Sequence, residues 1–549
     1  MDRKFDTLIL MALCLFFSIG NFIVLMQDNT YIAYEVQDSY TRTKIMYSEI
    51  TGNNFTGITQ ETKDEFRTEY PPLPHIIAIL FYFLFGVSED IMAFSLILFL
   101  FILLFSTYWT GRALFNAKVS IISAVLIGFF PAVIGHSRNF ISDFPELSLI
   151  ALSYMCFFRT RQLNDWKWSI VLGIAIGFGF LTKLTFPLFL LPMIIIGLSW
   201  LKISFKEKVQ RKFIRNLLVS GITAAIISLP WYLFNISNVV DGYIYDLTHY
   251  DSSYLSLSIQ QRFFDYAFTI PWTYLLGKVF YLLVVLGIAY IFFNYNKKYI
   301  SSGSKIVLLW LVVTILSLSM IGFYTHAIYE LPVLIPASLI LGIIFDRIFS
   351  IMQMKIRFLN RQFYAMLFTV LFFLLIYYLK VSQLAINSEF NYHSKFLETG
   401  LVTPHMINYS VDLVYTKIEK LSPSGITHNK MNVFVFSRQP PSVAICPYLL
   451  GKDISCFNYL ECKENKNGAE ARACESFFSG GYLEESLLNS DVIIVPLDPM
   501  DNKIVLINGQ EEEKEAIAAA IIEKNFRPEA SIKSYYENEF LGIFLRKNG

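Results

Sequence analysis

Charged residues are scarce in this chain. Only 16% of its 549 residues are Asp, Glu, Lys or Arg, whereas 54% are hydrophobic. In soluble domains about a quarter of the residues are charged, so this composition excludes an ordinary soluble protein. The formal net charge of +1 gives no basis for nucleic-acid binding. The composition predicts a polytopic membrane protein, in which the sidedness of charges matters more than their sum.

Several sequence signatures are missing as well. The chain contains no P-loop, no dinucleotide fingerprint and no H-E-x-x-H zinc motif, which argues against a nucleotide-derived substrate. Cysteine is rare, with six in the chain, and no pair has the C-x-x-C spacing of a zinc site. Cys14 and Cys156 fall in apolar segments, where cysteine behaves as a small core residue.

The N-terminal segment sets the orientation. Residues 8–26 form an apolar stretch long enough to span a bilayer, and no small-residue cleavage site follows, so we expect a retained helix. Arg3 and Lys4 precede it and favour a cytoplasmic N-terminus. Residues 27–90 are then the first extracytoplasmic loop. Its apolar run 76–87 is shorter than the ~20 residues a crossing needs, so it is predicted to be a juxtamembrane or re-entrant helix.

Ten further apolar segments bring the predicted crossings to eleven. They are residues 91–110, 119–135, 147–158, 169–181, 186–201, 217–234, 279–293, 306–323, 331–345 and 363–379. Basic residues follow alternate segments, most densely at 202–215, and they place the C-terminus outside. A twelfth crossing at 76–87 would put every later basic loop outside. Residues 1–381 are therefore predicted to be the transmembrane domain.

Residues 382–549 have the composition of a soluble domain. The segments 431–436, 491–496, 503–507 and 541–546 are typical of strands and 511–524 of a helix, which predicts a small extracytoplasmic α/β domain. Four cysteines lie here: Cys446, Cys456, Cys462 and Cys474. Because the predicted compartment is oxidising, we expect one or two disulfides, whose connectivity stays open.

The topology gathers polar groups at the outer ends of the helices and in the outer loops. They are Asp38, Arg138, Asp143, Glu146, Lys183, His326, Tyr329 and Glu330. Lys183 is the most informative, since a lysine in lipid costs about 2.5 kcal/mol or more at the bilayer centre and less near the surface. We therefore expect an anionic group to face it.

Several short motifs lie at the same predicted outer side and follow one another along the chain in a fixed order. It comprises Tyr70-Pro71-Pro72-Leu73 before the short apolar run, Pro131 with Ser137-Arg138 and Asp143, Leu181-Thr182-Lys183, and Tyr329-Glu330-Leu331-Pro332 with Pro336. In this order the motifs resemble the GT-C glycosyltransferases, in particular the group of protein O-mannosyltransferases and lipid A aminoarabinose transferases. The resemblance covers about residues 1–350. It implies a helical GT-C fold and transfer of a sugar from a polyprenyl-phosphate donor to a lipid, glycan or protein acceptor on the outer face.

The resemblance also implies roles for individual residues. An essential acid early in the first loop matches Asp38, although Ser39 follows where an Asp-Glu pair is usual, so Glu35 remains a rival. Relatives carry a base before the Pro-Pro-Leu element, where this chain has Tyr70, with Arg67 nearby.

The chemistry of sugar transfer from a polyprenyl phosphate requires the same residue types. A carboxylate such as Asp38 can take the acceptor proton, and Arg138 and Lys183 suit a leaving phosphate. A single displacement inverts the anomeric centre, and His326 and Tyr329 are candidates for binding the sugar or the phosphate.

Each assignment has a structural alternative. Arg138 and Asp143 could instead form a structural ion pair. Lys183 could extend towards lipid headgroups, and Glu146 could cap the helix that follows it. Asp38, Asp143, Glu146 and His326 are alternative ligands of a divalent metal. The tyrosines at 243, 245, 250 and 254 fit an interfacial aromatic belt slightly better than a substrate surface.

A transporter or flippase of a lipid-linked or anionic substrate is the alternative function. Such proteins typically carry an internal repeat and broken helices near the midplane. No repeat is visible in this chain, and its polar groups gather at one face instead. We therefore favour the glycosyltransferase, placed in a bacterial inner membrane.

Overall fold

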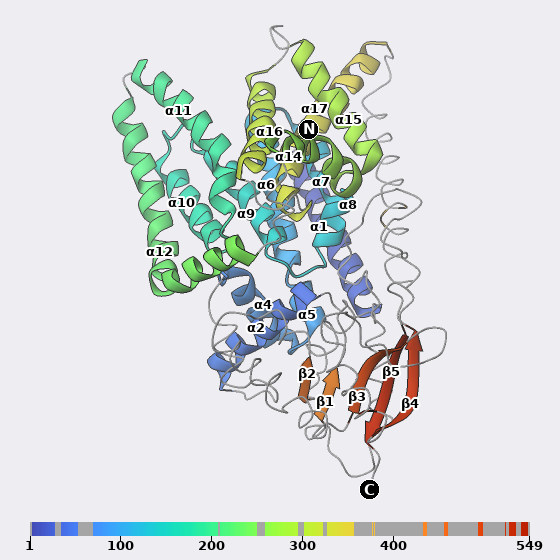
Figure 1. The fold of residues 1–549 in the computed structure, drawn as a ribbon. Helices are drawn as coiled ribbons and strands as arrows, with labels where there is room; N and C mark the ends of the chain where they lie inside the picture. Colours follow the sequence, from blue (N-terminus) through green and yellow to red (C-terminus); the bar gives the residue numbers. More distant parts are fainter. Residues whose placement is uncertain are drawn as a thin grey trace. The chain divides into compact units, whose positions relative to one another are not determined.

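The computed structural model describes residues 3–27, 34–52, 70–206, 209–249, 258–294, 301–321, 327–355, 376, 378, 432–435, 455–458, 492–497, 522, 526–533 and 540–546. The chain forms two compact units (Figure 1). Unit 1 comprises Met1–Gln27 and Thr68–Pro404, and unit 2 comprises Asp28–Arg67 and His405–Gly549. The predicted boundary between residues 381 and 382 lies outside the described residues and stays a prediction.

Unit 1 is helical throughout its described part. Its α-helices are α1 (Arg3–Gln27), α4 (Leu73–Phe85), α5 (Glu89–Phe94), α6 (Ile97–Leu114), α7 (Ala117–Gly128), α8 (Pro131–His136), α9 (Asp143–Arg159), α10 (Trp166–Phe180), α11 (Leu191–Lys206), α12 (Gln210–His249), α14 (Ile259–Phe264), α15 (Gly277–Phe293), α16 (Ser302–Ile321) and α17 (Leu334–Lys355). The 3₁₀-helices η1 (Phe186–Leu190) and η4 (Ala327–Val333) precede α11 and α17, and the π-helical turns η2 (Asp265–Thr269) and η3 (Pro271–Leu275) precede α15.

Six helical stretches in the described part are long and apolar enough to cross a membrane. They are Asp6–Met26, Glu89–Leu114, Phe186–Phe205, Gln210–Val240, Ser302–Met320 and Tyr329–Ile351. The chain is a multi-pass integral membrane protein. The last predicted crossing, 363–379, falls almost entirely outside the described residues, and the total of eleven stays a prediction.

Several predicted segments differ in detail from the helices observed: 91–110 is divided into α5 and α6, and 186–201 and 331–345 each begin as a 3₁₀-helix. Two further differences have a physical explanation. The segment 119–135 is two helices, α7 and α8, because Pro131 disfavours helical geometry at the residue before it and Phe130 is extended. The segment 217–234 is part of the much longer α12, which runs through Pro230 and 15 residues into the predicted outer loop. Hydropathy marks where a helix stops being apolar, whereas helical hydrogen bonding continues through polar sequence.

The short apolar run in the first loop forms α4. With 13 residues it is shorter than a crossing requires, as predicted from its length. Pro72 and Pro74 flank its start, where proline is tolerated because the first amides of a helix have no intrahelical partner. Gly86 ends the helix with a positive φ of 91°, a conformation that favours glycine.

Helices α10 and α12 pack closely and run in the same direction (Figure 1). Ser220 Oγ donates to Ser169 O at 2.8 Å near the start of both helices, and Tyr232 OH donates to Phe180 O at 2.8 Å near the end of α10. Gly173 makes the close approach feasible, since an added Cβ there would lie 2.5 Å from Ser220 O. Small residues at such positions let membrane helices approach backbone to backbone.

Unit 2 contains α2 (Tyr34–Thr51) and a five-stranded sheet of order β2-β1-β3-β5-β4. The strands are β1 (Asn432–Val435), β2 (Ser455–Asn458), β3 (Val492–Leu497), β4 (Phe526–Lys533) and β5 (Phe540–Arg546). β1 pairs in parallel with β2 and β3, and β5 pairs antiparallel with β3 and β4.

The predicted strands at 431–436, 491–496 and 541–546 are confirmed as β1, β3 and β5. The predicted strand 503–507 and all but Ile522 of the predicted helix 511–524 lie outside the described residues. The α/β character of this region therefore stays a prediction.

Candidate active site

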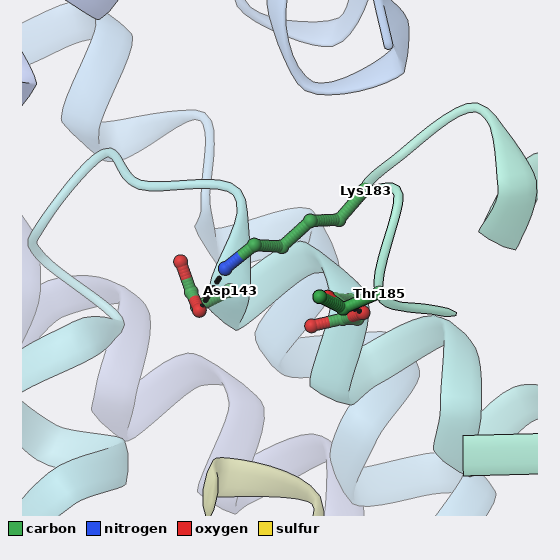
Figure 2. A network of polar contacts seen from close by, with 4 residues as sticks. Asp143, Lys183 and Thr185 are labelled. Atoms are coloured by element: carbon green, nitrogen blue, oxygen red, sulfur yellow. Dashed lines mark hydrogen bonds and ion pairs between the residues drawn. The ribbon is translucent and has the colours of Figure 1, made fainter. Parts of the chain in front are cut away.

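A buried ion pair is the centre of the polar cluster in unit 1. Lys183 lies in the short segment between α10 and η1, and its Nζ donates to Asp143 Oδ1 at the first residue of α9 (Figure 2). The two side chains are only 12% and 5% exposed. The anionic group expected to face Lys183 is thus a carboxylate of the protein itself, so this side chain does not reach towards lipid headgroups.

A second carboxylate lies on the same face of α9, three residues after Asp143. Glu146 is buried, and its Oε1 accepts a hydrogen bond from Thr185 Oγ1 at 2.7 Å. Lys183 and Thr185 therefore hold one acid each of the pair in the first turn of α9 (Figure 2). The structure thus shows Glu146 bonded to Thr185, and the described start of α9 has no side-chain cap hydrogen bond.

The ring of Tyr329 in η4 completes the surroundings of Lys183. The ammonium lies 4.4 Å from the ring centroid, within the range of a cation–π contact. Burial alone lowers the pKa of Lys183, but the charges of Asp143 and Glu146 outweigh it and hold that pKa above its usual value. Lys183 is therefore a permanent cation, suited to binding negative charge rather than to moving protons.

Arg138 belongs to a different cluster. Its Nε donates to Asn21 Oδ1 of α1 at 2.9 Å, and the guanidinium lies 5.1 Å from the ring centroid of Tyr378. Tyr378 OH donates to the same Asn21 oxygen at 3.1 Å, and Asn21 Nδ2 donates to Ser137 Oγ at 3.1 Å. Arg138 is only 1% exposed. Asp143 is thus paired with Lys183 and not with Arg138, which answers the alternative of an Arg138–Asp143 pair.

Glu330, next to Tyr329, is completely buried. Within the described residues neither of its carboxylate oxygens has a hydrogen-bond partner. The sequence placed Glu330 at the outer ends of the helices, and the structure adds that its carboxylate is enclosed there.

Sequence reasoning did not single out three residues of these clusters: Asn21, Thr185 and Tyr378. Asn21 carried a signal, because it and Ser18 are the polar residues within the apolar stretch 8–26. Thr185 lies two residues after Lys183 but has no distinguishing feature of its own. Tyr378 comes from a distant part of the chain, and only tertiary packing brings it to Asn21.

The remaining predicted site residues are not tested. Glu35 and Asp38 lie in α2 of unit 2, and their side chains are outside the described part. Arg67 and His326 also lie outside it, as do the side chains of Cys446, Cys456, Cys462 and Cys474. In the part that is described, no three His, Cys, Asp or Glu side chains group as a metal site would, and the alternative metal site built on Asp38 stays a prediction.

Comparison with known proteins places these clusters in a family context. Residues 69–232 match the family model of dolichyl-phosphate-mannose-protein mannosyltransferase. The match covers well under half of the chain but includes Arg138, Asp143, Glu146, Lys183 and Thr185. No curated protein matches the chain.

Solved structures match over nearly the whole chain. ArnT from Cupriavidus metallidurans in the apo state has a TM-score of 0.57 at 12% identity, covering 98% of this chain and 97% of that one. The same protein bound to undecaprenyl phosphate gives 0.56 at 13%, covering 99% and 98%. The oligosaccharyltransferase AglB from Archaeoglobus fulgidus, in complex with an inhibitory peptide and a dolichol-phosphate, gives 0.51 at 12%, covering 99% and 75%.

At these identities the likeness shows the fold alone. This chain has the fold of the GT-C glycosyltransferases, and its predicted resemblance to the protein O-mannosyltransferase and aminoarabinose transferase group is confirmed.

Proposed function

We propose that this chain is a membrane glycosyltransferase. It moves a sugar from a polyprenyl-phosphate donor to a lipid, glycan or protein acceptor on the outer face of a bacterial inner membrane, with its N-terminus inside and its C-terminus outside. The GT-C fold supports the reaction class, and the lipid phosphates bound to the neighbouring ArnT and AglB structures support the class of donor.

The observation that carries the proposal is the buried cluster around Lys183. A permanently charged ammonium is held by Asp143 and lies beside Glu146 and Tyr329. Asp143, Glu146 and Lys183 fall in the part of the chain that matches the mannosyltransferase model. A departing polyprenyl phosphate gains negative charge, and a fixed cation in a site of low dielectric stabilises that charge far more than water does. Asp143 orients the cation before the donor binds.

The rest of the assignment follows the chemistry. Asp38 is the proposed base that takes the acceptor proton, with Glu35 as its rival, and the displacement inverts the anomeric centre. Arg67, Arg138, His326 and Tyr329 are proposed to bind the donor phosphate or its sugar. A divalent metal on Asp38, Asp143 and Glu146 is the competing arrangement.

The test is transfer of labelled sugar from a panel of purified polyprenyl-phosphate sugars by the full chain in detergent. We expect transfer by the wild type and a loss of about 100-fold or more in Lys183→Met, the effect typical of removing one electrostatic stabiliser. Lys167→Met is the matched control, because Lys167 is exposed in the first turn of the same helix that Lys183 follows. It is expected to retain activity.

A parallel arm with chelator separates the two arrangements of the acids. Transfer that survives chelation supports Asp38 as a metal-independent base, whereas loss with chelator moves the acids to metal roles. If the wild type neither transfers nor hydrolyses any donor, the glycosyltransferase proposal fails and the transporter alternative replaces it.

A further inference from the structure

An apolar cavity lies between α10, α11 and α12. Its volume is about 670 Å³, within the range of roughly 300–1,000 Å³ typical of ligand sites. Nearly all of its lining side chains are hydrophobic, among them Ile176, Met193, Leu198 and Leu229. A cavity of this size and lining in a membrane protein suits hydrocarbon chains.

One end of the cavity is lined by one turn of the chain and the adjacent ends of two helices. Leu163 in the turn between α9 and α10, Leu201 in α11 and Phe213 at the start of α12 all line it. Asn216 Nδ2 donates to Leu163 O at 2.7 Å and so ties this turn to α12. Because α10 and α12 run in the same direction, this end lies at the start of both helices.

The same end carries a group of exposed basic residues, which we name the basic rim. It consists of Arg161, Lys202, Arg211, Lys212 and Arg215. Each lies within two residues of a side chain that lines the cavity. Among the residues that the structure describes, none of the five forms an ion pair. Asp165 is the acid of the adjoining turn, and its Oδ1 accepts from the backbone amides of Lys167 and Trp168 rather than from the basic rim.

Two further features make an anion favourable at the basic rim. The first turn of α12 contains no acidic residue, although the dipole of a helix favours negative charge at its start. In addition, Arg161, Gln162 and Leu163 all have positive φ, at 52°, 61° and 59°. Such backbone is costly for residues other than glycine, and here it brings Arg161 to the rim while Leu163 lines the cavity.

We infer that this cavity binds an anionic diacyl phospholipid, with its acyl chains among α10, α11 and α12 and its phosphate at the basic rim. Basic pockets between membrane helices recognise the headgroups of anionic lipids in this way. The cavity extends along α10 as far as Phe180 and Leu184, next to Lys183. The place of the phosphate therefore distinguishes the two lipids: the basic rim lies at the start of α10, whereas the donor phosphate is proposed to face Lys183 beyond its end, roughly 20 Å away at 1.5 Å per residue.

The experiment measures lipid binding by the full chain. Protein purified in detergent is exposed to phosphatidylglycerol or phosphatidylcholine, and bound lipid is quantified by native mass spectrometry. We expect preferential retention of phosphatidylglycerol by the wild type, and an affinity loss of roughly 10-fold or more in Arg211→Gln/Arg215→Gln. Arg112→Gln/Arg347→Gln, which removes two cations from α6 and α17, is expected to retain the preference.

A second variant tests the acyl-chain cavity without touching the charges. Gly221 lines the cavity, and a Cβ added there meets nothing within 4 Å, so Gly221→Leu extends into open space and leaves the fold intact. It is expected to weaken binding of both lipids. Equal retention of the two lipids by the wild type, unchanged binding in Gly221→Leu, or displacement of phosphatidylglycerol by equimolar undecaprenyl phosphate would each overturn the inference, and none of them bears on sugar transfer.

Discussion

At the scale of single residues, the pair of Lys183 and Asp143 illustrates how a buried charge is tolerated. Both side chains are nearly inaccessible, so each would be costly alone. Their attraction offsets the loss of hydration. Thr185 donates a hydrogen bond to Glu146, the acid one turn further along α9. Such a pair contributes little net stability but strongly penalises the loss of one partner.

This asymmetry gives a first prediction. Asp143→Asn removes the carboxylate that pairs directly with the Lys183 ammonium and is expected to destabilise the protein by about 3 kcal/mol. Asp143→Asn/Lys183→Met removes both charges and is expected to recover most of that stability while remaining inactive. Thermal unfolding in detergent measures the first effect and the transfer assay the second. Additive losses in the double variant would show that the two residues are not coupled.

Asn21 is a second residue of consequence. Its amide oxygen accepts from both Arg138 Nε and Tyr378 OH, so one side chain in α1 links two distant parts of unit 1. Asn21→Leu removes that acceptor, and we expect a loss of about 1–3 kcal/mol. Ser18→Ala on the same helix is the control, since within the described residues Ser18 bonds to a carbonyl of its own helix, that of Cys14. Unfolding temperatures of the two variants that do not differ would contradict the assignment.

At the scale of elements, the contact between α10 and α12 depends on residue size. Gly173 faces the backbone of α12 at Ser220, whereas Gly221 on α12 faces open space. The same substitution is therefore expected to cause a clash at Gly173 but not at Gly221, although both glycines lie inside helices.

This difference gives a matched pair of substitutions. Gly173→Ala forces α10 and α12 apart and is expected to destabilise by about 1–3 kcal/mol, the range for overpacking. Gly221→Ala removes only the helix penalty of glycine and is expected to stabilise by up to about 1 kcal/mol. Opposite shifts in unfolding temperature are the expected result, and shifts of the same sign would argue against the close contact.

Most of the predicted apolar segments within the described residues are helical in the structure. Two of the differences in helix boundaries have identifiable causes. Residue order and hydropathy located the helical segments, but Pro131 divided one of them and α12 continued past its apolar part. Local sequence controls where a helix is apolar, and backbone hydrogen bonding controls where it ends.

At the scale of the whole molecule, the first loop is divided between the two units. Residues 28–67, with α2, belong to the same unit as the C-terminal sheet, whereas α4 belongs to unit 1. The proposed base Asp38 and the proposed phosphate-binding Lys183 are therefore contributed by different units.

The role of Asp38 is testable without knowing how the units are arranged. Asp38→Asn is expected to lower kcat for sugar transfer by about 100- to 10,000-fold and to leave donor binding unchanged, because a base acts on the acceptor proton. Glu35→Gln is the matched comparison in the same helix. If Glu35→Gln loses transfer and Asp38→Asn retains it, the roles of the two acids are exchanged.

The sequence by itself determined that this is a polytopic helical membrane protein and where most of its helices lie, and it predicted that Asp143, Glu146 and Lys183 gather at one face. These properties follow from hydropathy and charge along the chain, which are local. Only the tertiary structure decided that Lys183 pairs with Asp143, that Arg138 bonds to Asn21, and that an apolar cavity opens beside the basic rim. Such partners depend on which helices pack together and at what depth, and residues far apart in the chain carry no local signal of that.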